Sequence, residues 1–178
     1  MGHKYSRDQI LTGALDTAFE GGLSLLSFGR VAKRLGVNDR MVVSYFPTTD
    51  DLVTEVVVAM GLQLQETLAP AFTSPSAGHR ELLRRAWPIL ARPDADPVFA
   101  LFFEASGLAT AGREPYASLV PQLVETWIVW AAGFLTGPAE ERRAEAETAI
   151  ALVDGLLLLR QLGGPEAAER AAHRIGIR

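Results

Sequence analysis

Apolar residues recur every three or four positions along most of this chain, which is the period of an α-helix. The first segment with this pattern begins at Ser6, where Gln9 three residues later completes a capping box. It ends at the pair Gly21-Gly22, because consecutive glycines stop a helix. Three further apolar segments lie before Pro70, and each follows a residue that favours the N-cap position. These residues are Ser27, Asn38 and Thr48.

The remainder of the chain also has the helical pattern, punctuated by proline and glycine. Residues 73–78, TSPSAG, form the clearest loop, and no strand alternation, repeat or low-complexity segment is present. The expected helices after this loop cover roughly residues 79–91, 96–109, 114–135, 138–162 and 166–175. The pattern therefore predicts an all-α fold of about nine helices, with a bundle in the C-terminal part.

The stretch from Ser27 to Leu52 predicts a helix-turn-helix followed by the start of a further helix. Ala32 provides the small residue needed where the two helices cross, and Gly36 provides a left-handed turn. Val42 is the apolar residue that brings the second helix onto the first. Most helix-turn-helix proteins place this second helix in the major groove of DNA.

Residues 5–55 resemble the N-terminal domain of TetR-type (tetracycline-repressor-like) regulators. The residues that fall on the family pattern are Ala32, Gly36, Val37, Val42, Tyr45, Phe46, Asp50, Asp51 and Leu52. The C-terminal two-thirds is similar to the family only in helical layout and length. The resemblance implies a homodimer whose two heads occupy successive major grooves of a double-stranded DNA operator. It also implies that the C-terminal bodies dimerise and enclose an effector pocket.

The resemblance further implies a helix-turn-helix DNA-binding domain over residues 1–52, here called the head. An effector-binding and dimerisation domain would follow over 53–178, with a long connecting helix over about 49–69. Arg40 would read a guanine edge, because its fork matches the O6 and N7 acceptors. Ser27 would offer its hydroxyl and a helix N-terminus to a phosphate. The implied DNA-binding residues are Ser27, Arg30, Lys33, Asn38, Asp39, Arg40, Val43, Ser44, Tyr45 and Thr49.

Two positions depart from the family pattern. Val43 stands where the family usually has a phosphate-contacting tyrosine, and Thr49 stands where it has lysine. Valine cannot donate a hydrogen bond, and threonine lacks the charge whose pairing releases a counterion. Both changes weaken the part of DNA binding that does not depend on sequence, although neither position belongs to the core of the head.

The charge distribution gives the head only a local basic patch. The formal net charge is −4, and residues 1–52 hold six basic and six acidic side chains. The rest holds eleven basic and fifteen acidic side chains, so the acidic surplus lies after Leu52. On charge alone, a solvated helix surface is the favoured interpretation of the cations between Arg30 and Arg40, whereas the family pattern favours a DNA contact for Arg40.

Aromatic side chains in the C-terminal part suggest an apolar pocket. Two groups of them fall on single helix faces, one around Phe99 and Phe103 and one around Trp127 and Trp130. Such stripes are either packed core or the lining of a pocket between helices. Glu104 either orients a ligand or faces water. The candidate ligand-binding residues are Met60, Trp87, Phe99, Phe103, Glu104, Trp127 and Trp130.

Composition excludes several other classes of protein. The chain has no cysteine, and its three histidines are scattered, so no metal or thiolate site is expected. No phosphate-binding glycine loop or nucleophile elbow occurs, so neither enzymatic activity nor a cofactor is expected. The polar N-terminus lacks a signal core, and the longest apolar tract, Ala149–Leu159, is too short to span a bilayer. A cytoplasmic protein without a membrane segment is expected.

The sequence thus predicts a dimeric DNA-binding transcriptional regulator, by family default a repressor, released by a small and largely apolar effector. One alternative is a protein of the same fold that acts as a ligand-binding or interaction module with weakened DNA binding, as Val43 and Thr49 suggest. A second alternative is a small all-α enzyme with an acid or base near Glu104.

Overall fold

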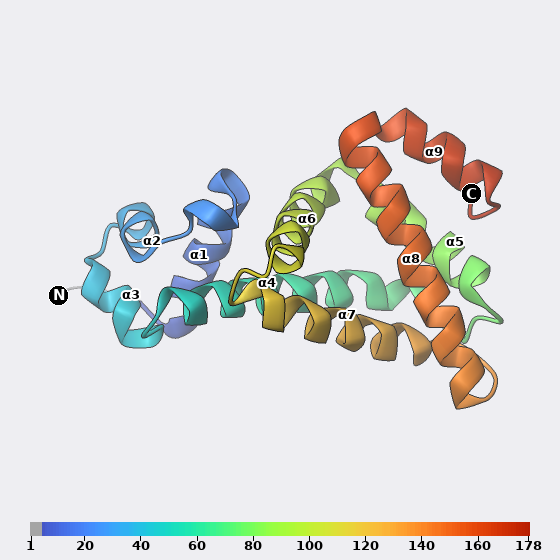
Figure 1. The fold of residues 1–178 in the computed structure, drawn as a ribbon, viewed down its shortest axis with the longest axis horizontal. Helices are drawn as coiled ribbons and strands as arrows, with labels where there is room; N and C mark the ends of the chain where they lie inside the picture. Colours follow the sequence, from blue (N-terminus) through green and yellow to red (C-terminus); the bar gives the residue numbers. More distant parts are fainter. Residues whose placement is uncertain (1–4) are drawn as a thin grey trace. The chain divides into compact units, whose positions relative to one another are not determined.

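A computed structural model describes residues 5–178, and those residues form nine α-helices (Figure 1). The helices are α1 (Arg7–Gly21), α2 (Phe28–Leu35), α3 (Asp39–Tyr45), α4 (Thr49–Leu68), α5 (His79–Leu90), α6 (Asp96–Thr110), α7 (Tyr116–Ala132), α8 (Ala139–Gly163) and α9 (Pro165–Arg174). Three short 3₁₀ helices connect them: η1 (Leu23–Leu25), η2 (Ala69–Ala71) and η3 (Pro93–Ala95). The all-α prediction is confirmed.

The helix starts in the head lie where the sequence predicts them. The Ser6 hydroxyl accepts from the Gln9 N–H at 3.2 Å, and the Gln9 side chain accepts from the Ser6 N–H at 2.9 Å. Each of the three later helices has the expected N-cap, whose side chain accepts a backbone N–H three residues on. These N-caps are Ser27, Asn38 and Thr48.

One predicted helix is shorter in the structure. The segment expected over 114–135 is helical only over Tyr116–Ala132. Pro115 directly precedes α7 and has no N–H to donate. At the other end, the Gly133 N–H donates to the Trp130 carbonyl at 3.1 Å and begins a turn. In that turn, Leu135 forms an isolated bridge with Ser76, the residue in the middle of the predicted loop.

The described chain divides into two compact units. The first contains the residues up to Leu62 together with Leu101–Val120, and the second contains Gln63–Ala100 and Pro121–Arg178. Helices α4, α6 and α7 therefore contribute residues to both units. These two units are defined by packing. The assignment of DNA binding to residues 1–52 and of effector binding and dimerisation to residues 53–178 stays a prediction.

The first unit has a core built by α1, α2, α3 and the beginning of α4. Contacts join α1 to α2 and α2 to α3. The side chains that fill this core include Ile10, Ala14, Ala18, Val31, Ala32, Val42, Phe46, Leu52 and Val56. Phe46 is 1% exposed, as expected from its place in the apolar pattern.

In the second unit, α8 packs against α5 and α9 (Figure 1). Arg160 of α8 is buried and forms a bidentate pair with Asp96, with Nε–Oδ1 and Nη2–Oδ2 distances of 2.5 and 3.0 Å. Glu145 of α8 accepts from the His79 N–H at 2.6 Å, so it caps the start of α5. These two polar contacts fix the beginnings of α5 and α6 against α8.

The segment Thr49–Ala71, which includes α4, is the one described helix with the length and composition of a membrane span, at a mean hydropathy of 1.2. Its apolar residues Leu52, Val56, Val57 and Met60 lie in a protein core. The core helix of a protein can have the same length and composition, so this segment is weak evidence for a membrane contact.

Candidate functional site

The turn between α2 and α3 has the geometry that a helix-turn-helix needs. Gly36 ends α2 at φ +69° and ψ 30°, the left-handed region that glycine adopts without cost. The Val37 N–H then donates to the Ala32 carbonyl at 3.0 Å. Ala32 and Val42 are 1% and 0% exposed, so the two helices meet at the small and apolar positions predicted from the sequence.

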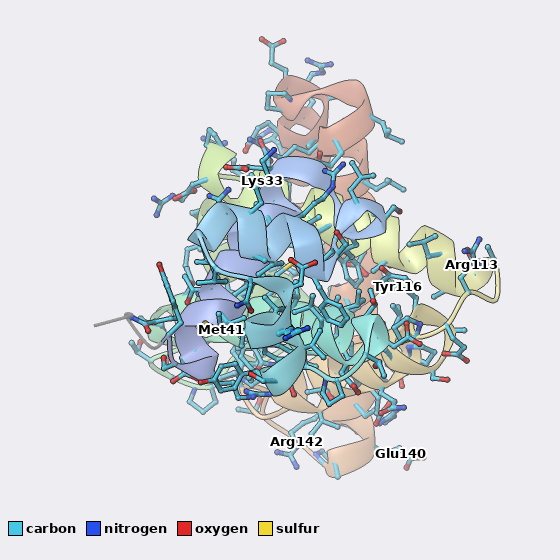
Figure 2. All side chains as sticks on the ribbon, turned by 90° about the vertical axis from the view of Figure 1, so that its left-hand side faces the viewer. Lys33, Met41, Arg113, Tyr116, Glu140 and Arg142 are labelled. Atoms are coloured by element: carbon cyan, nitrogen blue, oxygen red, sulfur yellow. The ribbon has the colours of Figure 1, made fainter. Side chains whose placement is uncertain are left out.

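One face of α3 carries three exposed side chains of different chemistry. They are Arg40, Val43 and Ser44, which stand opposite the buried Val42. Their spacing of three and four residues places them together on the helix surface. Figure 2 looks onto α2 and α3, with Met41 labelled on α3 and Lys33 on α2. α3 therefore presents a donor, an apolar group and a hydroxyl on one outward surface.

Ser44 is preset to accept a hydrogen bond at this surface. Its hydroxyl donates to the Met41 carbonyl at 2.7 Å. Because the proton is used within the helix, the oxygen lone pairs are what the side chain offers outward. Arg40, which has donors only, complements it.

Several cations of the head are free, and others are not. Among the described residues, Arg30, Lys33 and Arg40 form no ion pair. Arg34 pairs with Glu20 at 2.5 Å and with Asp16 at 3.5 Å. The hydrogen bond that the Arg34 guanidinium donates to the Glu20 carboxylate raises the pKa of Arg34. The structure thus separates Arg34 from the unpaired cations of α2 and α3, a distinction that charge patterning alone does not make.

Tyr45 has an internal hydrogen-bond partner. Its hydroxyl donates to the Tyr5 carbonyl at 2.9 Å, and the Tyr5 hydroxyl donates to the Leu35 carbonyl at 3.0 Å. These bonds tie the end of α3 to the end of α2 through the segment before α1. The Tyr45 hydroxyl therefore has a structural role in the head. The contact of Tyr45 with DNA stays a prediction.

The other candidate DNA-binding residues lie at helix starts around α2, α3 and α4. Ser27 caps α2 through its oxygen, which leaves the hydroxyl proton available to a phosphate. Asn38 caps α3, and Asp39 is the first residue of that helix. Thr49 begins α4 and is exposed. The expected phosphate and base contacts of these residues stay predictions.

Glu104 of α6 lies against the connection between α1 and α2, and the sequence pattern did not predict this contact. Its carboxylate accepts from the Leu23 and Ser24 N–H groups at 2.8 Å each, and from the Ser24 hydroxyl at 2.6 Å. Partial burial raises the pKa of Glu104, but the bonds from Ser24 and Leu23 outweigh it, so the pKa lies below its ordinary value. Glu104 therefore holds η1 to α6 as an anion.

Gly22 is required at this contact. It lies at φ +84° and ψ 165°, a conformation that residues with a side chain rarely adopt. A Cβ atom there would lie 2.9 Å from Glu104 Oε2. The second glycine of the pair thus ends α1 and also makes room for the carboxylate.

The candidate ligand-binding residues fall into both units. Met60, Phe103 and Glu104 belong to the first unit, whereas Trp87, Phe99, Trp127 and Trp130 belong to the second. Met60, Trp87 and Phe99 are buried, as core residues are. Their roles in binding a ligand stay predictions.

An aromatic cluster forms within the second unit around Trp130. Its ring centroid lies 5.2 Å from that of Trp127, 4.8 Å from that of Phe134 and 5.7 Å from that of Phe72. Phe72 was not among the candidate residues. Phe134 continues the i, i+3, i+7 face of Trp127 and Trp130, whereas nothing in the sequence relates Phe72 to α7.

A hollow of about 300 Å³ lies between α7 and the start of α8 in the second unit. Its lining residues are Ile128, Val129, Ala132, Gly133, Ala139, Arg142 and Arg143. Arg143 is neutralised by Glu125, with two guanidinium–carboxylate distances of 2.7 and 2.8 Å. The Nε atom of Arg142, labelled in Figure 2, is buried and has no hydrogen-bond partner in the described part of the chain.

Comparison with known proteins decides the identity of the head. The sequence profile of "Bacterial regulatory proteins, tetR family" matches residues 10–56, which include α2, the turn at Gly36 and α3. Residues 10–56 therefore match the DNA-binding N-terminal domain of this family. Regulators of the tetR family are DNA-binding transcription factors and not enzymes, so the enzyme alternative has no support.

Solved structures extend the likeness in fold to nearly the whole chain. A transcriptional regulator from Rhodococcus sp. Rha1 is 24% identical, with a TM-score of 0.75 over 97% of this chain and 94% of that one. A TetR transcriptional regulator from Legionella pneumophila is 21% identical, with a TM-score of 0.70 over 98% and 97% of the two chains. The multidrug binding protein EbrR, solved with proflavin, is 24% identical, with a TM-score of 0.62 over 94% and 98%. No curated protein matches the chain.

Proposed function

We propose that this tetR-family regulator is a homodimeric repressor that binds a DNA operator and is released by a small, largely apolar effector. The proposed DNA binding is supported by the outward surface of α3, where Arg40, Val43 and Ser44 are exposed. Arg30 and Lys33 on the neighbouring α2 add positive charge that no described acidic side chain pairs. Phosphates attract such unpaired cations, and base edges accept from an arginine fork.

The test is binding of the purified protein to the intergenic DNA that flanks its own gene. Fluorescence anisotropy is measured at several salt concentrations, with and without excess competitor DNA. We expect binding that survives the competitor and weakens as salt rises, because each neutralised phosphate releases a counterion. If neither this DNA nor a random DNA pool yields a bound sequence, the head does not read DNA and the proposal fails.

The homodimer is supported by an apolar stripe along α8. Ala151, Gly155, Leu158, Leu159 and Leu162 follow one another at helical spacing, and all five are exposed. The three leucines are 41%, 38% and 81% exposed, respectively. Water-exposed leucines in a row are typical of a surface that a partner covers. A second copy of this chain can cover the stripe with its own.

Leu162→Glu is expected to convert the dimer into a monomer, because it places two charges in the proposed interface of each dimer. The side chain is 81% exposed, so the fold itself should tolerate the change. Light scattering at micromolar concentration measures the mass. Val129→Glu is the matched control, since Val129 is 59% exposed but lies on α7. A wild-type monomer would contradict the proposed dimer, and a dimeric Leu162→Glu variant would place the interface elsewhere.

We infer that the effector is a flat aromatic molecule that binds in the second unit. The cluster of Phe72, Trp127, Trp130 and Phe134 provides ring faces and edges for stacking. EbrR, which shares the fold, was solved with the aromatic molecule proflavin and with imidazole. Of the candidate effector-binding residues, Glu104 is the weakest, because its carboxylate already accepts three hydrogen bonds.

Two substitutions toward the family pattern are expected to strengthen DNA binding. Val43→Tyr adds one neutral phosphate hydrogen bond of about 1 kcal/mol per head, worth about 30-fold in the affinity of a dimer for DNA of any sequence. Thr49→Lys adds one charge per head, so the slope of log affinity against log salt should steepen by about two per dimer. Salt titrations of both variants separate these effects, with Thr49→Gln as the uncharged control. Equal slopes for Thr49→Lys and Thr49→Gln would show that α4 does not approach the phosphates.

The second candidate function is a ligand-binding or interaction module with weakened DNA binding. Val43 and Thr49 favour it, since each removes a phosphate contact of the family. If the repressor function holds, the protein acts in the cytoplasm, where its operator lies. The two candidates differ in the outcome of DNA selection from a random pool.

A further inference from the structure

We propose that Val43 is a specificity-determining residue that recognises the 5-methyl group of a thymine, next to a guanine read by Arg40. This inference rests on the proposed DNA binding of α3 and specifies the bases that it recognises. Family members usually carry a phosphate-binding tyrosine at this position, so a valine here changes what the residue can contact.

Val43 is available for such a contact. It is 39% exposed and is one of the few large apolar side chains of the first unit that the core leaves exposed. Valine has no donor or acceptor, so it cannot bind a phosphate oxygen or the polar edge of a base. The one apolar group that a base presents in the major groove is the thymine methyl. Burial of an exposed valine against that methyl removes both from water.

The neighbours of Val43 leave room for this contact. Ser44 lies beside it on the outward surface, and its hydroxyl proton is engaged by the Met41 carbonyl. Asp39, one turn earlier, lies near the first turn of α2, where a Cβ on Gly29 would be 3.5 Å from Asp39 Oδ2. The carboxylate is therefore placed beside α2, toward the beginning of α3.

The spacing of Arg40 and Val43 sets the spacing of the two bases. Three residues of an α-helix advance about 4.5 Å along its axis. Base pairs follow one another at about 3.4 Å. An α3 that lies along the groove therefore places the arginine fork and the valine over neighbouring base pairs. Each half-site should contain a guanine and a thymine on adjacent base pairs.

The experiment uses the full-length protein and DNA that it has itself selected from a random pool. In synthetic duplexes of the selected sequence, each thymine is replaced singly by deoxyuridine, which removes only the methyl group. We expect one position per half-site, adjacent to the guanine, where this change lowers affinity roughly threefold to fivefold. Other thymines should tolerate the replacement.

Three variants test whether Val43 causes this discrimination. Val43→Ala removes both γ-methyl groups and should bind the thymine and deoxyuridine duplexes equally. Val43→Thr keeps one γ-methyl group and should still prefer thymine. Ser44→Ala is the control on the same surface and should retain the preference. Circular dichroism confirms the fold of each variant, which an exposed position such as 43 should not alter.

The outcomes separate this inference from the proposed function. Selected DNA that is bound equally with thymine or deoxyuridine at every position overturns the inference and leaves the DNA-binding function intact. A thymine preference that survives in Val43→Ala also overturns it. Failure to select any DNA overturns both proposals together.

Discussion

Arg40→Ala is expected to lower affinity for the selected operator by between about 30-fold and 10⁴-fold. A bidentate arginine–guanine contact is worth about 1–3 kcal/mol, and a dimer makes two of them. The variant should also bind operators with another base at that position as well as it binds guanine. Because Arg40 is exposed and has no ion pair in the described structure, its stability should change by no more than about 0.5 kcal/mol.

Two controls separate base recognition from simple loss of charge. Arg113→Ala removes the same charge from the exposed loop between α6 and α7, labelled in Figure 2. Arg40→Lys keeps the charge but loses the planar fork. Anisotropy titrations should give a large loss for Arg40→Ala, an intermediate loss for Arg40→Lys and little change for Arg113→Ala. If the Arg40 and Arg113 variants are equally impaired, the contribution of Arg40 is electrostatic only.

Gly22→Ala is expected to lower the free energy of unfolding by about 2–4 kcal/mol. Holding an alanine at the Gly22 conformation costs about 1–3 kcal/mol. Its Cβ would also lie 2.9 Å from Glu104 Oε2, so the carboxylate must move away from η1. That movement weakens three hydrogen bonds that the anion accepts from Leu23 and Ser24. Urea unfolding at pH 7 measures the change.

A double-mutant cycle with Glu104→Ala tests this explanation. Glu104→Ala alone should cost about 1–2 kcal/mol, the range found for lost helix caps. In the double variant the overlap between the Cβ atom and the carboxylate is absent and only the backbone strain remains. The double variant should therefore lose less unfolding free energy than the sum of the losses in the two single variants. Full additivity would show that the strain of Gly22 and the contact of Glu104 are independent. Gly112→Ala, at φ +71° with nothing near its Cβ position, is the control for strain alone.

The contribution of Glu104 should depend on pH in a defined direction. Its pKa is lowered in the folded state, so the stabilisation is complete above the ordinary glutamate pKa of about 4.3. It is lost as the pH falls through the lowered value, because protonation removes the anion that accepts the three bonds. The stability difference between the wild type and Glu104→Gln should therefore shrink below about pH 4. A difference that stays constant down to pH 3 would contradict an anionic Glu104 in this contact.

The helices and the helix-turn-helix could be predicted from local patterns in the amino-acid sequence. The caps at Ser27 and Asn38 and the left-handed turn at Gly36 are decided within three or four residues, so they are readable without the fold. The burial of Ala32 and Val42 follows from helical period and residue size. Even the departure at Val43 was visible, since its identity alone excludes a phosphate hydrogen bond.

Which polar and aromatic groups contact each other could not be predicted from the sequence, because these contacts depend on helix packing. Glu104 lies 80 residues after Ser24 in the chain, and packing alone brings its carboxylate to η1. In the same way, Arg34 is paired with Glu20 whereas Arg40 is left free, although both are arginines of one basic segment. Phe72 joins Trp130 across nearly 60 residues. Local signals fix a helix because its bonds are local, whereas contacts between distant segments depend on how the helices pack.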